Sequence, residues 1–277
     1  GGRCPFLDGE DLCALHRAWG AEATPLTCQT HPRFTEEFGP FAERTLSAAC
    51  PAANALLLGN REPLGFREVE TGEPGEEGDE WLPYLVPFRQ RLFTVLQDRS
   101  RPLRARLADF LTLCLLGDAV LADAEREGAA PEGLLTLEGG TLEGELPEEG
   151  IFPVGFRLLA SLEVLEPDWR DVLARAGTAA PVPQDEALLE RIAVYFAYRS
   201  ILKCVNDGDL LGRGLYTVFL PLAAERIAAV CGLPEALRRL SREVEHDADN
   251  GEALLTAFRD DAAFDLGCFL RELRDPE

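Results

Sequence analysis

Apolar residues recur at helical spacing over most of the chain. Between Pro102 and Gly128, leucines and phenylalanines follow one another at intervals of three and four residues, as on one face of an amphipathic helix. The same reasoning predicts helices over residues 87–98, 155–176 with a break at Pro167, 185–206, 210–231, 234–246, 251–258 and 261–273. Residues 134–146 alternate between apolar and polar around two glycines, which favours a small hairpin. Helices dominate, so the pattern predicts an all-α bundle.

The stretch 185–206 is the clearest of these helices. Acidic residues stand at its start, where the helix dipole favours them, and it is apolar on most sides, as in a central, buried helix. Arg199 lies within it and therefore needs a carboxylate partner, because an unpaired buried guanidinium is costly. We expect this partner to be Asp207, Asp209 or Glu243.

Composition narrows the classes of partner. The chain has 277 residues, of which 46% are hydrophobic and 27% charged, as in a folded globular protein. Its 27 basic and 49 acidic side chains give a net charge of −22, which disfavours nucleic acid and anionic membranes as partners. No uninterrupted run of about 18 apolar residues is present, and the first residues lack the pattern of a signal peptide. We therefore expect a cytoplasmic protein.

Eight cysteines are unevenly distributed. Cys4, Cys13, Cys28 and Cys50 fall among turn-forming residues in the first fifth of the chain. Two disulfides are disfavoured in the cytoplasm, zinc modules usually contain close cysteine pairs, and an iron–sulfur cluster tolerates irregular spacing. Spacing alone leaves these alternatives open. The remaining cysteines lie in apolar runs and are expected to be buried: Cys114, Cys204, Cys231 and Cys268.

The distribution of residues predicts three parts. Residues 1–60 form a small cysteine-rich module, residues 61–84 a linker rich in Gly, Glu and Pro, and residues 85–277 the helical domain. The fold class is thus mainly α. Because the first module is too small for a large core of its own, we expect Cys4, Cys13 and Cys28 to converge.

Several familiar catalytic motifs are absent from the sequence. There is no GxGxxG after a strand, no P-loop and no HExxH, and only three histidines occur. These absences disfavour Rossmann nucleotide binding and histidine-based hydrolysis. Asp207 and Asp209 follow a predicted helix directly, so they are either a solvated loop or ligands of a cation or amine. Residues 241–246 form a second polar cluster, which is either a helix end with a charged face or part of the same site.

Three segments, in order, resemble the flagellin lysine-N-methylase family. The first comprises CPFL at 4–7, LC at 12–13, TCQTHPR at 27–33, RTLS at 44–47 and CP at 50–51. The second comprises YFAYR at 195–199, LK at 202–203 and DGDL at 207–210, and the third is SREVEH at 241–246. Together these segments extend over nearly the whole chain.

The resemblance implies transfer of methyl groups from S-adenosylmethionine to lysine side chains of flagellin, with an iron–sulfur cluster of the 4Fe-4S type. It implies Cys4, Cys13 and Cys28 as cluster ligands, with Cys50 either a fourth ligand or a structural residue. Family members usually carry a further cysteine-rich stretch upstream of these segments, so further cluster ligands are expected there, and His31 stands where an aromatic residue is common.

Two hypotheses follow, from different classes. In the first, the chain is a protein-lysine methyltransferase with a pocket between the cysteine-rich module and the helix of Arg199, where a carboxylate or tyrosine takes the proton of the lysine. In the second, it is a non-catalytic metal-binding module attached to a helical protein-interaction domain. The first hypothesis assigns catalysis to Asp207, Asp209, Tyr198 and Glu243, and binding of substrate or cofactor to Tyr195, Arg199 and His246.

Overall fold

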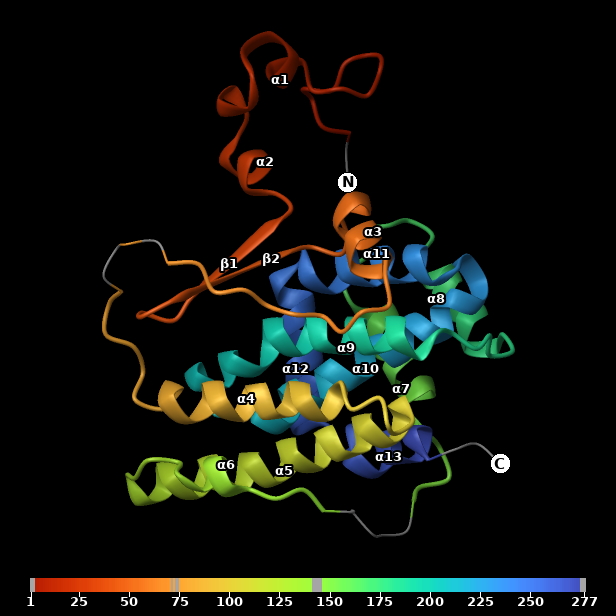
Figure 1. Ribbon diagram of the computed structural model, residues 1–277. Coiled ribbons are helices and arrows are strands. Elements are labelled where there is room, and N and C mark those ends of the chain that lie inside the picture. The colour runs from red at the N-terminus through yellow and green to blue at the C-terminus, as the bar shows by residue number, and fades with distance from the viewer. Residues whose placement is uncertain (1–2, 71, 73–74, 141–145, 275–277) are drawn as a thin grey trace.

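The computed structural model describes residues 3–70, 72, 75–140 and 146–274. Figure 1 shows a body of packed helices, with a short hairpin lying against it and the first segment of the chain extending away from it. The described part is mainly α, as the hydrophobic pattern predicts. Its α-helices are α1 Ala14–Trp19, α2 Leu26–Thr30, α3 Pro51–Leu58, α4 Leu82–Leu96, α5 Leu103–Glu127, α6 Gly133–Thr136, α7 Ile151–Ser161, α8 Trp169–Thr178, α9 Glu186–Ser200, α10 Leu210–Cys231, α11 Leu233–Glu245, α12 Ala248–Asp260 and α13 Leu266–Leu273.

Helix α10 forms the centre of the helical body. It packs against α5, α8, α9, α11 and α12. Its 22 residues have a mean hydropathy of 1.4 over their most apolar window, so by length and composition alone α10 is able to cross a membrane. However, 67% of that window is buried inside the protein, as is usual for the core helix of a folded body.

The predicted helices are largely confirmed, and their ends follow local chemistry. Helix α5 ends at Gly128, which adopts a left-handed backbone with φ 64°. At the start of α9, the side chain of Asp185 accepts a hydrogen bond from the Ala187 N–H at 2.9 Å. Helix α4 begins at Leu82 and contains Pro87, so residue 87 is not the helix start that the sequence predicts.

The predicted hairpin at 134–146 is wrong for the residues described there. Residues 133–136 form the short helix α6, residues 137–140 form no strand, and residues 141–145 lie outside the described residues. A hairpin occurs instead inside the cysteine-rich module. Strand β1, Arg33–Glu37, pairs antiparallel with β2, Ala42–Leu46, with Phe34 opposite Thr45 and Glu36 opposite Glu43.

The segment before β1 contributes little to the core. Neither α1 nor α2 contains a buried residue, and Trp19 and Leu26 are 72% and 74% exposed. After β2 the chain joins the helical body: the Ala48 N–H donates to the Tyr195 hydroxyl at 3.2 Å. The Asn54 side chain donates to the carbonyl oxygens of Ala48 and Pro234. These bonds attach the hairpin and α3 to α9 and α11.

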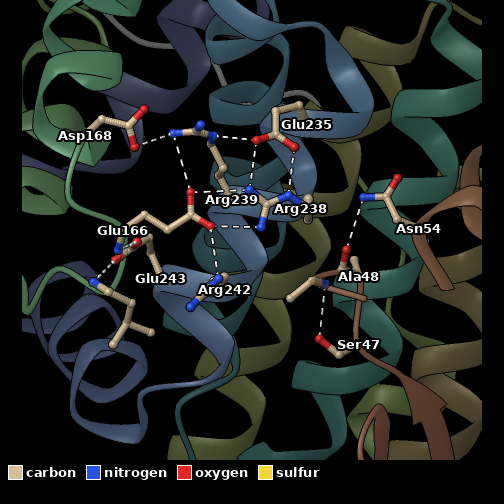
Figure 2. A network of polar contacts seen from close by, with 12 residues as sticks. Ser47, Ala48, Asn54, Glu166, Asp168, Glu235, Arg238, Arg239, Arg242 and Glu243 are labelled. Atoms are coloured by element: carbon tan, nitrogen blue, oxygen red, sulfur yellow. Dashed lines mark hydrogen bonds and ion pairs between the residues drawn. The ribbon is translucent and has the colours of Figure 1, made fainter. Parts of the chain in front are cut away.

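A network of charged side chains joins α11 to the loop before α8 (Figure 2). Glu166 lies among three arginines of α11 and accepts a hydrogen bond from Arg238 at 2.8 Å. Glu243 is 1% exposed and accepts the backbone N–H groups of Leu165 and Glu166 at 2.9 and 2.7 Å. The network gives the Leu165 and Glu166 backbone and the Glu166 carboxylate their hydrogen-bond partners and ties this loop to α11.

Candidate functional site

A cavity of about 350 Å³ lies where the hairpin covers the ends of several helices. One face of the hairpin supplies its first wall, and the other walls come from the end of α9, the 3₁₀ segment Ile201–Asn206, the start of α10 and the α11–α12 junction. The sequence predicts a pocket between the cysteine-rich module and the helix of Arg199, and the cavity confirms that location. The residues from the hairpin are Phe34, Glu36, Phe38, Glu43 and Thr45.

Arg199 forms part of the cavity wall, and its side chain is 16% exposed. Its Nε lies 2.6 Å from Glu245 Oε1, and its Nη1 donates to Thr45 Oγ1 at 2.6 Å. The guanidinium carbon lies 3.8 Å from the centre of the Phe34 ring, a cation–π contact. Arg199 is therefore held by the hairpin on one side and by α11 on the other.

The predicted pairing of Arg199 with a carboxylate is confirmed, and its side chain is largely but not fully buried, but the predicted partners are wrong. The carboxylate is that of Glu245, not of Asp207, Asp209 or Glu243. Glu245 is only two residues after Glu243 on α11, but on a helix this places the two side chains on different faces. Glu245 is on the face of α11 that lines the cavity.

Glu245 connects the cavity to the interior. Its side chain is 3% exposed and accepts hydrogen bonds from the hydroxyls of Ser241 and Tyr195, the latter at 3.1 Å. Burial, with the Glu245 charge second, raises the pKa of Tyr195 well above its usual value, so this phenol stays protonated and donates. The Tyr195 oxygen also accepts the Ala48 N–H, so one chain of bonds runs from the module through Tyr195 to Glu245 and Arg199.

Aromatic rings form much of the cavity wall. Tyr198 stacks on Phe66 with ring centres 3.8 Å apart, and the Arg89 guanidinium lies 4.8 Å from its ring centre. Burial raises the pKa of Tyr198 to about 12. Burial also raises the pKa of Tyr216, on α10, far above its usual value. Both phenols are therefore neutral at physiological pH. The aromatic residues of the wall are Phe34, Phe38, Phe196, Tyr198 and Tyr216.

Carboxylates outnumber basic groups in the lining described here, five to three. The basic groups are all paired: Arg199 with Glu245, Lys203 with Glu36 at 2.7 Å, and Arg213 with Asp207. Asp247 accepts the N–H groups that begin α12, at 3.0 and 3.1 Å. Glu252, exposed on the next turn of α12, forms no ion pair with any described residue. An acidic and aromatic cavity of this kind favours a cation.

The other predicted carboxylates lie outside the cavity lining. Asp209 is buried and caps α10, accepting the Gly212 N–H at 2.8 Å, and burial raises its pKa. Glu243 accepts two backbone N–H groups of the loop before α8, and burial raises its pKa too. Asp207 is partly exposed and holds Arg213 toward the cavity. The structure thus brings Tyr198 and Arg199 together at the cavity and gives these three carboxylates local partners elsewhere.

His246 lies next to the cavity, at the end of α11. Its Nε2 is 2.7 Å from Ser47 Oγ, and its ring is 5.6 Å from both Phe34 and His31. Burial lowers the pKa of His246, the charge of Glu245 opposes this lowering, and the nearby guanidinium of Arg199 adds to it. His246 therefore joins the hairpin to α11 rather than lining the cavity itself.

The cysteines divide as the sequence predicts only in part. Cys114 and Cys204 are buried, and Cys231 and Cys268 are partly buried. Cys4 and Cys28 are exposed, and Leu7 bridges to Cys13 through the backbone, which folds the first turn back on itself.

No group of three or more metal-binding side chains gathers among the residues that the structure describes. As placed, Cys4, Cys13, Cys28 and Cys50 do not fit the four-ligand cradle that an iron–sulfur cluster requires. The predicted convergence of the first three cysteines is therefore not seen among the described residues, and the cluster stays a prediction.

Sequence reasoning missed several residues of this site. Phe34 and Thr45 belong to a hairpin that was not predicted, and Tyr216 lies within a helix whose apolar residues all suit a core. Glu245 was within reach, since it belongs to the polar cluster 241–246 that the sequence singles out. The sequence does not indicate which face of that helix packs against Arg199.

The chain is similar over about a quarter of its length to three curated proteins. It is 31% identical over 70 residues to the "Flagellar biosynthetic protein FliU" of Salmonella muenchen. The matched segment is 25% of this chain and 41% of FliU. It is 31% identical over 67 residues to the "Lysine-N-methylase" of Salmonella typhimurium and of Salmonella choleraesuis, covering 24% of this chain and 17% of each methylase. The matches thus span between 17% and 41% of the length of these relatives. No family model and no solved structure matches the chain.

Proposed function

We propose that this chain is part of a protein-lysine methyltransferase, with flagellin as the substrate and S-adenosylmethionine as the methyl donor. The observation that carries the proposal is the acidic and aromatic cavity beside Arg199, which suits the ammonium group of a lysine side chain. The names of the relatives, a lysine-N-methylase and a flagellar biosynthetic protein, support methylation of lysine and a flagellar context. We expect the enzyme to act in the cytoplasm.

The lysine enters the cavity as a cation and must lose a proton before it reacts. The ring of Tyr198 is already occupied by Phe66 and Arg89, so this neutral phenol offers the ammonium its hydroxyl oxygen. The neutral phenol of Tyr216 offers both its ring and its oxygen lone pairs. Glu252 faces the cavity without an ion-pair partner among the described residues, so its carboxylate takes the proton, directly or through one water. In contrast, the Glu245 carboxylate is held by Arg199 and Tyr195 and positions the wall.

The chemistry of methyl transfer sets the remaining requirement. The lone pair of the neutral amine forms the new N–C bond while the C–S bond of the sulfonium breaks, and the donor leaves as a neutral thioether. A positive charge therefore moves from sulfur to nitrogen, and Asp247 and Glu252, the lining carboxylates without an ion-pair partner among the described residues, keep this charge favourable at both places. An iron–sulfur cluster on Cys4, Cys13, Cys28 and Cys50 remains part of the proposal only as the resemblance implies it.

The test is incorporation of labelled methyl groups into purified flagellin by the full chain with S-adenosylmethionine. Replacing Glu252 by Gln keeps its size and removes the proton acceptor, so we expect a loss of about a hundredfold in rate with the melting temperature unchanged. Glu127→Gln, an exposed carboxylate at the end of α5, is the matched control and should keep the wild-type rate.

The possible outcomes test the role of Glu252 and the methyltransferase activity of the chain separately. A wild-type rate in Glu252→Gln would remove this residue from the mechanism. No incorporation by the wild-type chain, including protein purified without oxygen, would reject methyl transfer by this chain and favour the non-catalytic binding module.

A further inference from the structure

The hairpin beside the cavity has a free outer edge. In an antiparallel pair, residues that exchange backbone hydrogen bonds alternate with residues that do not. Because the Phe38 N–H donates to Phe41 and the Ser47 N–H donates to Pro32, the bonded positions of β1 are its even-numbered residues. Arg33, Thr35 and Glu37 therefore direct their N–H and C=O groups outward, and no described residue bonds to these groups.

The two strands occupy different sides of the cavity. On β2, Glu43 accepts a hydrogen bond from Arg89 of α4 at 2.8 Å, so this strand lies toward α4. On β1, Phe34 contacts His246 at the end of α11, and Phe34 and Glu36 share the cavity with the first turns of α12. The free edge of β1 thus lies on the side where Asp247 and Glu252 line the cavity.

We propose that an extended segment of the protein substrate pairs with the outer edge of β1 and places its lysine in the cavity. The inference rests on the proposed function and adds how the substrate is held. A strand added to β1 continues the alternation of the hairpin, so every second side chain lies on the face that covers the cavity. The backbone then supplies binding without regard to sequence, while the carboxylates of the lining select a basic side chain.

A single substitution removes a hydrogen-bond donor from the outer edge of β1 and keeps the bonds between β1 and β2. Proline at position 35 lacks the outward N–H of β1, and the bonds between β1 and β2 do not use that group. Arg44→Pro makes the same change at the residue opposite Thr35, on the outer edge of β2, and is the matched control. Both variants should melt like the wild-type chain.

The probe is a fluorescein-labelled peptide of about seven residues, a common strand length, with a central lysine between alternating threonine and valine. Its binding to the full chain is followed by fluorescence anisotropy with no methyl donor present. We expect Thr35→Pro to weaken binding by about tenfold, the equivalent of one or two hydrogen bonds, and Arg44→Pro to leave it unchanged.

Two further peptides test the edge from the side of the ligand. Each carries backbone N-methyl groups on every second residue, one on the odd and one on the even positions. Only the peptide in which the methylated nitrogens would face β1 should lose binding, because a methylated nitrogen has no N–H to donate. Equal binding of the two peptides, or equal effects of Thr35→Pro and Arg44→Pro, overturns the inference. Because no methyl transfer is measured, edge-dependent binding supports the inference even where the proposed reaction fails.

Discussion

The ion pair between Arg199 and Glu245 joins two helices that are not consecutive in the chain, α9 and α11. The burial of Arg199 follows from the apolar surroundings of its helix, and burial requires a carboxylate. The identity of that carboxylate depends on how α11 packs beside α9, which local spacing does not encode. Asp207 is closer in sequence, but it lies beyond the helix end and pairs with Arg213, whereas Glu245 approaches Arg199 from a distant helix.

The pairing predicts a large difference between two substitutions of the same kind. In Glu245→Gln the guanidinium of Arg199 stays buried without its counter-charge, so we expect the free energy of unfolding to fall by about 3 kcal/mol. The control is Glu36→Gln. Glu36 and Lys203 are 43% and 36% exposed, and loss of their pair should cost less than about 1 kcal/mol. Urea denaturation measures both, and equal losses would contradict the role given to Glu245.

At the level of elements, the helices were predictable and the hairpin was not. The long apolar repeats of α5, α9 and α10 encode their own period, because one face of each must be buried. In β1 and β2 half of the residues are charged, and the strands are short. They are held by tertiary contacts, Glu43 with Arg89 and Thr45 with Arg199, that no local pattern reveals.

The packing of α10 on α5 gives an element-level prediction. A Cβ at Gly214 would lie 2.8 Å from both Cβ and Sγ of Cys114, so Gly214→Ala must push the two helices apart. We expect a loss of about 2 kcal/mol. At Gly177, exposed on α8, the nearest atom is Cδ2 of Phe156 at 3.8 Å, and Gly177→Ala should instead stabilise by about 0.5 kcal/mol. Thermal unfolding that shifts the same way in both variants would contradict this account of the helix interface.

At the level of the whole molecule, ion pairs between distant segments organise an acidic chain. The excess of acidic over basic residues was visible from composition. Composition does not show which carboxylates the arginines pair with. Glu190, fully buried on α9, binds Arg99 and Arg106, and Glu166 binds three arginines of α11. Such networks depend on elements far apart in sequence, so composition predicts the net charge but not which carboxylates the fold depends on.

Glu235, on α11, gives this distribution of charge a measurable pH dependence. Its carboxylate accepts hydrogen bonds from Arg238 and Arg239 at 2.7 and 2.6 Å, and these bonds, with Arg238 first, lower its pKa from 4.5 to about 2. A carboxyl group with a lowered pKa in the folded state stabilises that state above pH 4.5. This contribution is lost as the pH falls from 4.5 toward 2, because the unfolded chain takes up the proton first.

Glu235→Gln should therefore be less stable than the wild-type chain at pH 6 and should lose less stability between pH 5 and pH 3. Exposed Glu127, on α5, makes no ion pair with a described residue, so Glu127→Gln should follow the wild-type curve. The midpoints of urea denaturation of the three proteins, measured between pH 6 and pH 3, test both expectations. If all three proteins lost stability in parallel as the pH falls, the arginines of α11 would not be holding Glu235 in its charged form.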